Sequence, residues 1–225
     1  MQRLFTVLRT ALCQRGVKFN SIIWDWNGTL LNDLEIAIGA INQLLGERGL
    51  PRITTERYLE TFTFPVRDYY EKIGFDLINE LFEIPAARFT AIYNKAVANC
   101  PLHEEVIPLL GRLKDMGCRQ FIVSAMEQEQ LEKTVTDSGI RPFFEDLCGL
   151  NNHFAASKVE AGLSLITQRR LNPDTTLMVG DTIHDFEVAQ SLGCSCILVA
   201  NGHQSKGRLL STGVTVLDRL EEIKL

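Results

Sequence analysis

The chain has 225 residues, with 23 basic and 28 acidic side chains and a formal net charge of −5. Hydrophobic residues make up 45% and charged residues 23%, which is typical of a globular protein with a substantial core. Nucleic acid is not expected as a partner, because its phosphates are bound by clustered Lys and Arg. A membrane-spanning helix is not expected either, because no run approaches the ~18 continuous apolar residues that one needs.

The first twenty residues contain four basic side chains and no acidic one. A basic, amphipathic start is also compatible with a transit peptide or a weak signal sequence. The apolar stretch near Leu4 is interrupted by Thr6 and Arg9, however, and no small-residue cleavage site follows it. We therefore interpret residues 1–20 as an N-terminal extension that forms a short surface helix.

Four short apolar runs that end in turn residues predict buried parallel strands. These runs are 21–26, 121–123, 177–179 and 196–199. Helical patterns are predicted at 104–116, 127–138, 158–170 and 185–192. This alternation predicts an α/β fold with a doubly wound, Rossmann-like parallel sheet, built from residues 21–32 and 104–225.

Residues 33–103 lack this alternation and show three or four helical segments without a convincing strand. Leu34, Ile38, Ile41 and Leu45, for example, fall on one face of a helix. The segment is therefore predicted to be a helical insertion between the first and second strands of the core.

The six cysteines form neither a CxxC pair nor a Cys/His spacing typical of zinc. Free thiols are expected in a reducing compartment. The cysteines therefore favour a cytoplasmic protein.

Polar side chains follow three of the predicted strands, at the sheet edge where ligands bind in folds of this kind. They are Asp25, Ser124 and Asp181, and Asp185 follows four residues after Asp181. Each alone has a structural explanation, such as a helix N-cap or a turn. Carboxylates together suit Mg²⁺, and a hydroxyl with helix N-terminal amides suits phosphate oxygens. The combination predicts a Mg²⁺ site that handles a phosphate.

The same residues carry a family resemblance. Asp25 opens the run Asp-Trp-Asn-Gly-Thr-Leu, Ser124 ends an apolar strand, Lys158 opens a helix, and residues 178–185 read Met-Val-Gly-Asp-Thr-Ile-His-Asp. In these four motifs, over residues 20–221, the chain resembles the haloacid dehalogenase-like hydrolase superfamily and its phosphoglycolate-phosphatase-like group. The insertion 33–103 resembles the helical cap of that family.

The resemblance implies a phosphatase in which Asp25 attacks phosphorus and forms an aspartyl-phosphate. Mg²⁺ would be held by Asp25, the backbone carbonyl of Asn27, Asp181 and Asp185. Lys158 would offset the repulsion between Asp25 and an anionic substrate.

The substrate implied is a small phosphorylated metabolite. Its phosphoryl oxygens would contact Ser124 and Lys158, with Thr29 and Ala125 as further substrate-binding residues. We expect a monomer or a homodimer. Among cap residues, Phe64, Arg67 and two neighbouring tyrosines could line the pocket, although a role in the cap's own packing is the stronger interpretation. Arg67 is the cap residue chosen as a candidate for binding an anionic substrate.

Asn27 departs from the family pattern, which has an Asp there that protonates the leaving oxygen and later deprotonates water. An amide has no proton to exchange in this pH range, and loss of a positioned acid costs about 10²–10⁴ in rate. Three explanations stay open: a substrate with a good leaving group, a proton supplied by another residue, or binding with little turnover. The rival functions are a phosphotransferase, a carbon–phosphorus or carbon–halogen hydrolase, and a catalytically weak protein that binds phosphorylated ligands.

Overall fold

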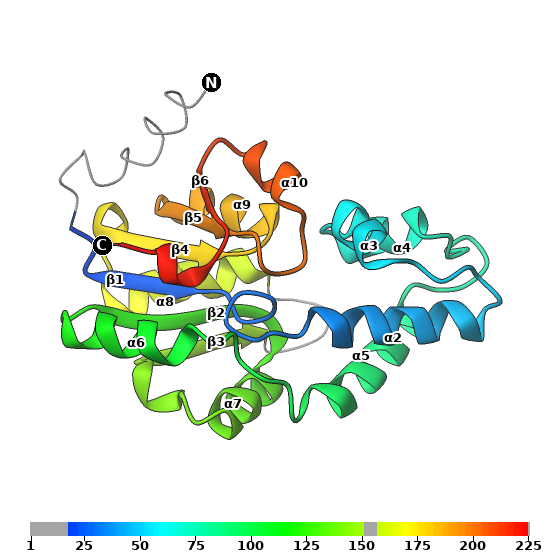
Figure 1. Cartoon of the computed structure of the whole chain (residues 1–225), viewed down its shortest axis with the longest axis horizontal. Helices are drawn as coiled ribbons and strands as arrows, with labels where there is room; N and C mark the ends of the chain where they lie inside the picture. The colour runs from blue at the N-terminus through cyan, green and yellow to red at the C-terminus, as the bar shows by residue number, and fades with distance from the viewer. Residues whose placement is uncertain (1–17, 151–156, 225) are drawn as a thin grey trace.

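The computed structural model of the protein describes residues 18–150 and 157–224, and the helix predicted in the N-terminal extension lies outside this part. Six parallel strands form one sheet in the order β3-β2-β1-β4-β5-β6 (Figure 1). They are β1 Ser21–Trp24, β2 Arg119–Glu127, β3 Asp146–Leu150, β4 Thr176–Gly180, β5 Ser195–Val199 and β6 Thr215–Leu217. The predicted doubly wound α/β class is confirmed.

Helices cover both faces of the sheet. Helices α6 (Val106–Asp115) and α7 (Gln128–Asp137) contribute to one apolar cluster, and α8 (Lys158–Arg169), α9 (Ile183–Leu192) and α10 (Lys206–Leu210) contribute to the other. Within β1, Ile22 and Trp24 belong to the first cluster and Ile23 to the second. Successive side chains of a strand point to opposite faces of the sheet. Because helices cover both faces here, the whole run had to be apolar.

The helices α6, α7, α8 and α9 begin and end within about two residues of the predicted bounds, whereas α10 was not predicted. In the described part of the core, short 3₁₀ segments lie at Arg141–Phe143, Pro173–Thr175 and Leu220–Glu222. The edge strands β3 and β6 were not predicted, because their half-buried residues give no continuous apolar signal. Among the described residues no helix is long and apolar enough to cross a membrane.

Four helices lie between β1 and α6, in the insertion: α2 Leu34–Glu47, α3 Thr55–Thr61, α4 Val66–Lys72 and α5 Glu83–Val97. They extend beyond the carboxyl ends of the strands (Figure 1). The chain enters and leaves this segment along paired backbones: Leu31 and Leu102 form an antiparallel bridge, and Asn32 N donates a 2.9 Å hydrogen bond to Pro101 O. The insertion is therefore joined to the core by two adjacent connections.

Candidate active site

Asp25 follows β1 at the centre of the sheet, where its backbone N donates a 2.9 Å hydrogen bond to Val179 O of β4. The chain then turns sharply at Gly28, which has φ of +76°. A Cβ at this glycine would fall 2.4 Å from Oδ2 of Asp181. Glycine is needed here both for its backbone conformation and for the close approach of the Asp181 carboxylate.

Three carboxylates meet at this edge. Asp25, Asp181 and Asp185 each offer an oxygen within 4.8 Å of the others. Asp25 is 6% exposed and the other two are fully buried. Asp181 follows β4, and Asp185 lies in the first turn of α9. The structure thus brings together the three carboxylates that the sequence predicted at one edge of the sheet.

Lys158 opens α8 and its buried ammonium lies between two of these carboxylates. Its Nζ is 2.5 Å from Oδ1 of Asp25 and 2.5 Å from Oδ1 of Asp185. A solvated surface position for this lysine is excluded, because the residue is only 5% exposed. The ammonium therefore neutralises part of the negative charge that Asp25 and Asp185 bring to the cluster.

Burial and the neighbouring charges together set the pKa values of the three carboxyl groups. Burial raises the pKa of Asp25 well above its usual range, against the opposing effect of Lys158. Burial likewise raises the pKa of Asp181 to about 6. For Asp185, burial is outweighed by the Lys158 ammonium and by hydrogen bonds from Thr182, so its pKa is lowered. Lys158 is itself shifted upward, because the two carboxylates outweigh the burial of its ammonium and raise its pKa.

The donor set fits a hard divalent cation such as Mg²⁺, which takes carboxylate oxygens as ligands. Asp181 is fixed in orientation by Thr29 Oγ1, which donates to Oδ1 at 2.8 Å, and by His203 N, which donates to Oδ2 at 2.6 Å. Carboxylates oriented by such hydrogen bonds are typical of metal sites.

Asp185 also has the structural role of a helix-capping residue. Its Oδ2 accepts hydrogen bonds from Thr182 N at 2.9 Å and Thr182 Oγ1 at 2.7 Å, which completes a capping box at the start of α9. Its Oδ1 remains directed at Lys158. The two roles use different oxygens and are compatible.

Ser124 was expected to end its strand, but β2 continues to Glu127. The ladder with β1 stops at Ile122, and the register with β3 shifts between Val123 and Glu127. Ser124 therefore lies at an irregularity in β2, fully buried, with Oγ accepting a 3.0 Å hydrogen bond from Met126 N.

Asn27 lies between Ser124 and the insertion. Ser124 Oγ approaches Asn27 Oδ1 at 3.5 Å, a long contact. On the other side, Asn27 Nδ2 donates to Asp33 Oδ2 at 3.1 Å and to the Tyr93 hydroxyl at 2.6 Å. Ala125, the remaining predicted substrate-binding residue of the core, is exposed next to Ser124.

Two buried residues near the site were not predicted to belong to it. Asp33 precedes α2 and is 1% exposed, and His203 follows β5 and is 6% exposed. His203 Nε2 lies 3.2 Å from Asp33 Oδ1 and Nδ1 lies 3.0 Å from the Tyr58 hydroxyl of α3. Burial lowers the pKa of His203, but Asp33 outweighs it and the result is a rise to about 9. Neither residue belongs to one of the four motifs, so nothing in the sequence indicated that either one lies at the site.

The predicted cap residues separate into buried and exposed positions. Tyr69 and Tyr70 are buried within the insertion. The Phe64 ring stacks on His184 of α9, with 4.6 Å between centroids. Arg67 is 53% exposed, and its guanidinium pairs at 3.5 Å with Glu71 of the same helix. Among the described residues the structure does not bring Arg67 to the carboxylate cluster.

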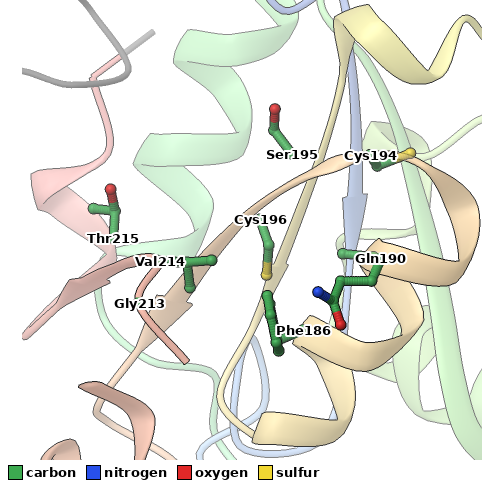
Figure 2. A pocket seen from close by; sticks show the side chains of 9 residues that line it. Phe186, Gln190, Cys194, Ser195, Cys196, Gly213, Val214 and Thr215 are labelled. Carbon is green, nitrogen blue, oxygen red and sulfur yellow. The ribbon is translucent and has the colours of Figure 1, made fainter. Parts of the chain in front are cut away.

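A cavity of about 300 Å³ lies elsewhere in the core, and Figure 2 shows side chains that line it. It is lined by Phe186 and Gln190 of α9 and by residues at the amino ends of β5 and β6, including Ser195 and Thr215. These strand ends lie at the edge of the sheet opposite to Asp25. The cavity is therefore separate from the carboxylate cluster.

Comparison with known proteins identifies the family. The model of the haloacid dehalogenase-like hydrolases matches residues 22–199, so the chain belongs to this family and the resemblance seen in the motifs is confirmed. The chain is similar to tyrosine-protein kinase PtkA of Mycobacterium tuberculosis, with 23% identity over 87% of this chain and 67% of the relative. It is also similar to pyrophosphatase PpaX of Anoxybacillus flavithermus, with 24% identity over 82% of this chain and 85% of the relative.

A solved structure supports the fold. The crystal structure of a predicted phosphoglycolate phosphatase from Haemophilus somnus matches with a TM-score of 0.72 and 21% identity, covering 89% of this chain and 94% of the other. The similarity extends over the core and the insertion, because it covers most of both chains. At this identity the match supports the fold of the chain.

Proposed function

We propose that the protein is a cytoplasmic, Mg²⁺-dependent phosphatase that hydrolyses a small phosphorylated metabolite through a phosphoryl group carried by Asp25. The observation that carries this proposal is the buried cluster of three carboxylates, two of which contact the ammonium of Lys158. Membership of a hydrolase family and a relative named as a pyrophosphatase support it.

In the proposed reaction a carboxylate oxygen of Asp25 attacks phosphorus, and the bond from phosphorus to the leaving oxygen breaks with its electron pair on that oxygen. Water then attacks the phosphorus, releases inorganic phosphate and regenerates the carboxylate. Lys158 and Ser124 bind the phosphoryl oxygens, and Lys158 reduces the repulsion between Asp25 and the anionic substrate. Mg²⁺, when held by the three carboxylates and the Asn27 carbonyl, supplies charge neutralisation.

The helical insertion, residues 33–103, acts in this proposal as a cap over the core formed by residues 21–32 and 104–225. A closed cap excludes water from the site and contacts the leaving group. The stacking of Phe64 on His184 supports a cap that rests on the core next to Asp185. Thr29, Ala125 and Arg67 are further substrate-binding candidates, and Arg67→Ala tests the last of them through the Michaelis constant.

Asn27 makes the proposed phosphatase selective for good leaving groups. An amide cannot protonate an alkoxide, whereas a carboxylate or a phosphate leaves as a stable anion without a proton. The relative named as a pyrophosphatase supports this class, because its name describes cleavage of a phosphoanhydride. Acyl phosphates and phosphoanhydrides are therefore the favoured substrates.

A phosphotransferase is the second candidate. One relative is named as a tyrosine-protein kinase, and it matches over 87% of this chain. The phosphoryl group on Asp25 would then pass to an acceptor hydroxyl instead of water. A carbon–phosphorus or carbon–halogen hydrolase and a weakly catalytic ligand-binding protein are further candidates. Whether the chain acts as a monomer or a homodimer does not alter the test.

The test measures phosphate release from acetyl phosphate, pyrophosphate, an alkyl phosphate and a phosphonate, and halide release from a haloacid, with Mg²⁺ and with chelator. We expect turnover of the first two, lost in Asp25→Asn and lost with chelator. Acid quenching during turnover should trap labelled phosphate on the wild-type chain and not on the variant. Because an Asn-Gly pair can deamidate, the intact mass of each sample is checked for conversion of Asn27 to Asp.

A further inference from the structure

Asp33 is a buried carboxylate that belongs to none of the four motifs. It precedes α2, but its side chain makes no capping hydrogen bond with that helix. Its oxygens contact residues of the core and Tyr93 of α5 instead. Oδ1 accepts a 2.7 Å hydrogen bond from Gly28 N and faces His203 Nε2 at 3.2 Å, and Oδ2 accepts from Asn27 Nδ2 and from the Tyr93 hydroxyl. All four acceptor directions of the carboxylate are therefore used.

These contacts fix which way the Asn27 amide faces. A carboxylate at Asp33 only accepts, so the nitrogen of Asn27 must be turned toward it. The Tyr93 hydroxyl gives its hydrogen to Asp33, so it accepts the second N–H of Asn27. Both N–H groups of Asn27 are consumed by Asp33 and Tyr93, and only its Oδ1 is left on the side of Ser124.

We propose that Asp33 is a positioning residue that locks the Asn27 amide in this orientation. In this orientation Asn27 offers no N–H to the leaving oxygen, at the position where a family member with Asp would supply a proton. The proposal rests on the proposed function and deepens it: Asp33 and Tyr93 set the preference for acyl phosphates and phosphoanhydrides over alkyl phosphates.

The lock requires one amide and one carboxylate. Asn27 and Asp33 are joined by a 3.1 Å hydrogen bond in a buried environment. A carboxylate at both positions would place two negative groups in contact, and an amide at both would leave the hydrogen bonds from Gly28, Tyr93 and His203 without their charged acceptor. Exchanging the two residues restores one of each.

The central experiment is a cycle of four proteins: wild type, Asn27→Asp, Asp33→Asn and the exchanged double variant. We expect each single variant to unfold at a lower temperature than wild type, and the double variant to recover most of the loss. We also expect the ratio of kcat/KM for acetyl phosphate to that for glycerol phosphate to fall about tenfold or more in two of the variants. In Asp33→Asn the freed N–H of Asn27 can donate a hydrogen bond to the leaving oxygen, and in the double variant a carboxyl group at position 27 can protonate it. Additive losses of unfolding temperature, or an unchanged ratio in Asp33→Asn, would overturn the positioning role.

A matched pair of tyrosine variants separates the lock from general packing. Tyr93→Phe removes a hydroxyl that holds Asn27, whereas Tyr69→Phe removes a buried hydroxyl that has no hydrogen-bond partner among the described residues. The ratio of the two kcat/KM values should fall in Tyr93→Phe and stay at the wild-type value in Tyr69→Phe. Equal effects of the two variants would contradict the proposal.

The unfolding measurements keep the two proposals apart. If the wild-type protein releases phosphate from neither acetyl phosphate nor glycerol phosphate, the proposed function is overturned, and the proposed selectivity with it. The coupling between Asn27 and Asp33 in thermal unfolding needs no turnover, so it decides the positioning contact independently.

Discussion

Lys158 and Asp25 form a buried ion pair in which Nζ lies 2.5 Å from Oδ1. The pair joins the start of α8 to the end of β1, two elements separated by 133 positions in the sequence. Because the same ammonium also contacts Asp185, its removal would leave two buried carboxylates without their countercharge.

We therefore expect Lys158→Met to be damaging in two ways. Removing one partner of a buried pair costs about 3–5 kcal/mol of unfolding free energy. Phosphate release should fall by about 10² or more, since the charge that faces the reacting phosphoryl group is lost. Denaturant unfolding and steady-state kinetics measure the two effects.

The control for this prediction is Lys133→Met. Lys133 forms an ion pair of the same length with Asp137, but its side chain is 60% exposed. Exposed pairs contribute little because water screens them, so unfolding and activity should stay near wild type. Similar losses in both variants would show that the burial of Lys158 is not what matters.

Gly202 tests the placement of Asp181. A Cβ at this glycine would fall 2.1 Å from Asp181 Oδ2, so Gly202→Ala must displace the carboxylate. We expect the Mg²⁺ concentration for half-maximal activity to rise about tenfold or more, as is typical when an orienting contact of a metal ligand is disturbed. Titration of activity with Mg²⁺ and the rise of unfolding temperature on adding Mg²⁺ measure the effect.

Gly207→Ala is the matched variant. It lies in α10, five residues along the chain, and a Cβ there would meet nothing within 4 Å. Alanine in a helix is favoured over glycine by about 0.5–1 kcal/mol, so the variant should be neutral or slightly stabilised. An unchanged Mg²⁺ requirement in both variants would contradict the assignment of Asp181 as a ligand.

The sequence predicted this edge of the sheet well because the signals there are local. A short apolar run followed by Asp or Ser marks the carboxyl end of a buried strand, and parallel strands bring those ends together. That reasoning placed Asp25, Asp181 and Asp185 at one edge, where the structure has them within 4.8 Å. Lys158 was placed with them only through its order in the family motifs.

The residues that were missed are those whose role depends on contacts far apart in the sequence. His203 reaches Asp33 across 170 positions, and Tyr93 reaches Asn27 across 66. No periodicity encodes such pairs, because they arise only when the insertion packs against the core. Edge strand β6 was not predicted for a different reason: the pattern of its three half-buried residues resembles that of a loop.

His203 leads to a prediction of pH dependence. Its pKa in the folded protein, about 9, lies above the ordinary value of 6.5, because the contact with Asp33 outweighs burial. Protonation therefore favours the folded state, and this stabilisation is complete below about pH 6.5 and is lost as the pH rises through 9. The difference in unfolding temperature between wild type and His203→Gln should be largest near pH 6 and should shrink toward pH 9.5.

His184→Gln provides a comparison in which a neighbouring histidine is replaced. His184 is a half-buried histidine near the site that pairs with Glu187 on the surface of α9. At each pH, the difference in unfolding temperature between wild type and His184→Gln should be smaller than the largest difference for His203→Gln. A His203→Gln difference that is constant over this range would show that the charge of His203 does not contribute to stability.

Arg208 attaches the insertion to the core, and it provides the last prediction. Its Nη1 donates to Leu59 O at 2.9 Å and to Phe62 O at 2.6 Å, at the carboxyl end of α3, where a cation is favourable. Arg208→Met removes both hydrogen bonds while keeping an apolar side chain of similar length. The amide hydrogens of α3 should therefore exchange about tenfold faster or more. KM should also rise more than kcat falls, because the insertion is held less firmly against the core. Arg57→Met, on the exposed face of α3, should leave exchange and KM unchanged. If exchange in α3 is equal in the two variants, Arg208 does not hold the insertion against the core.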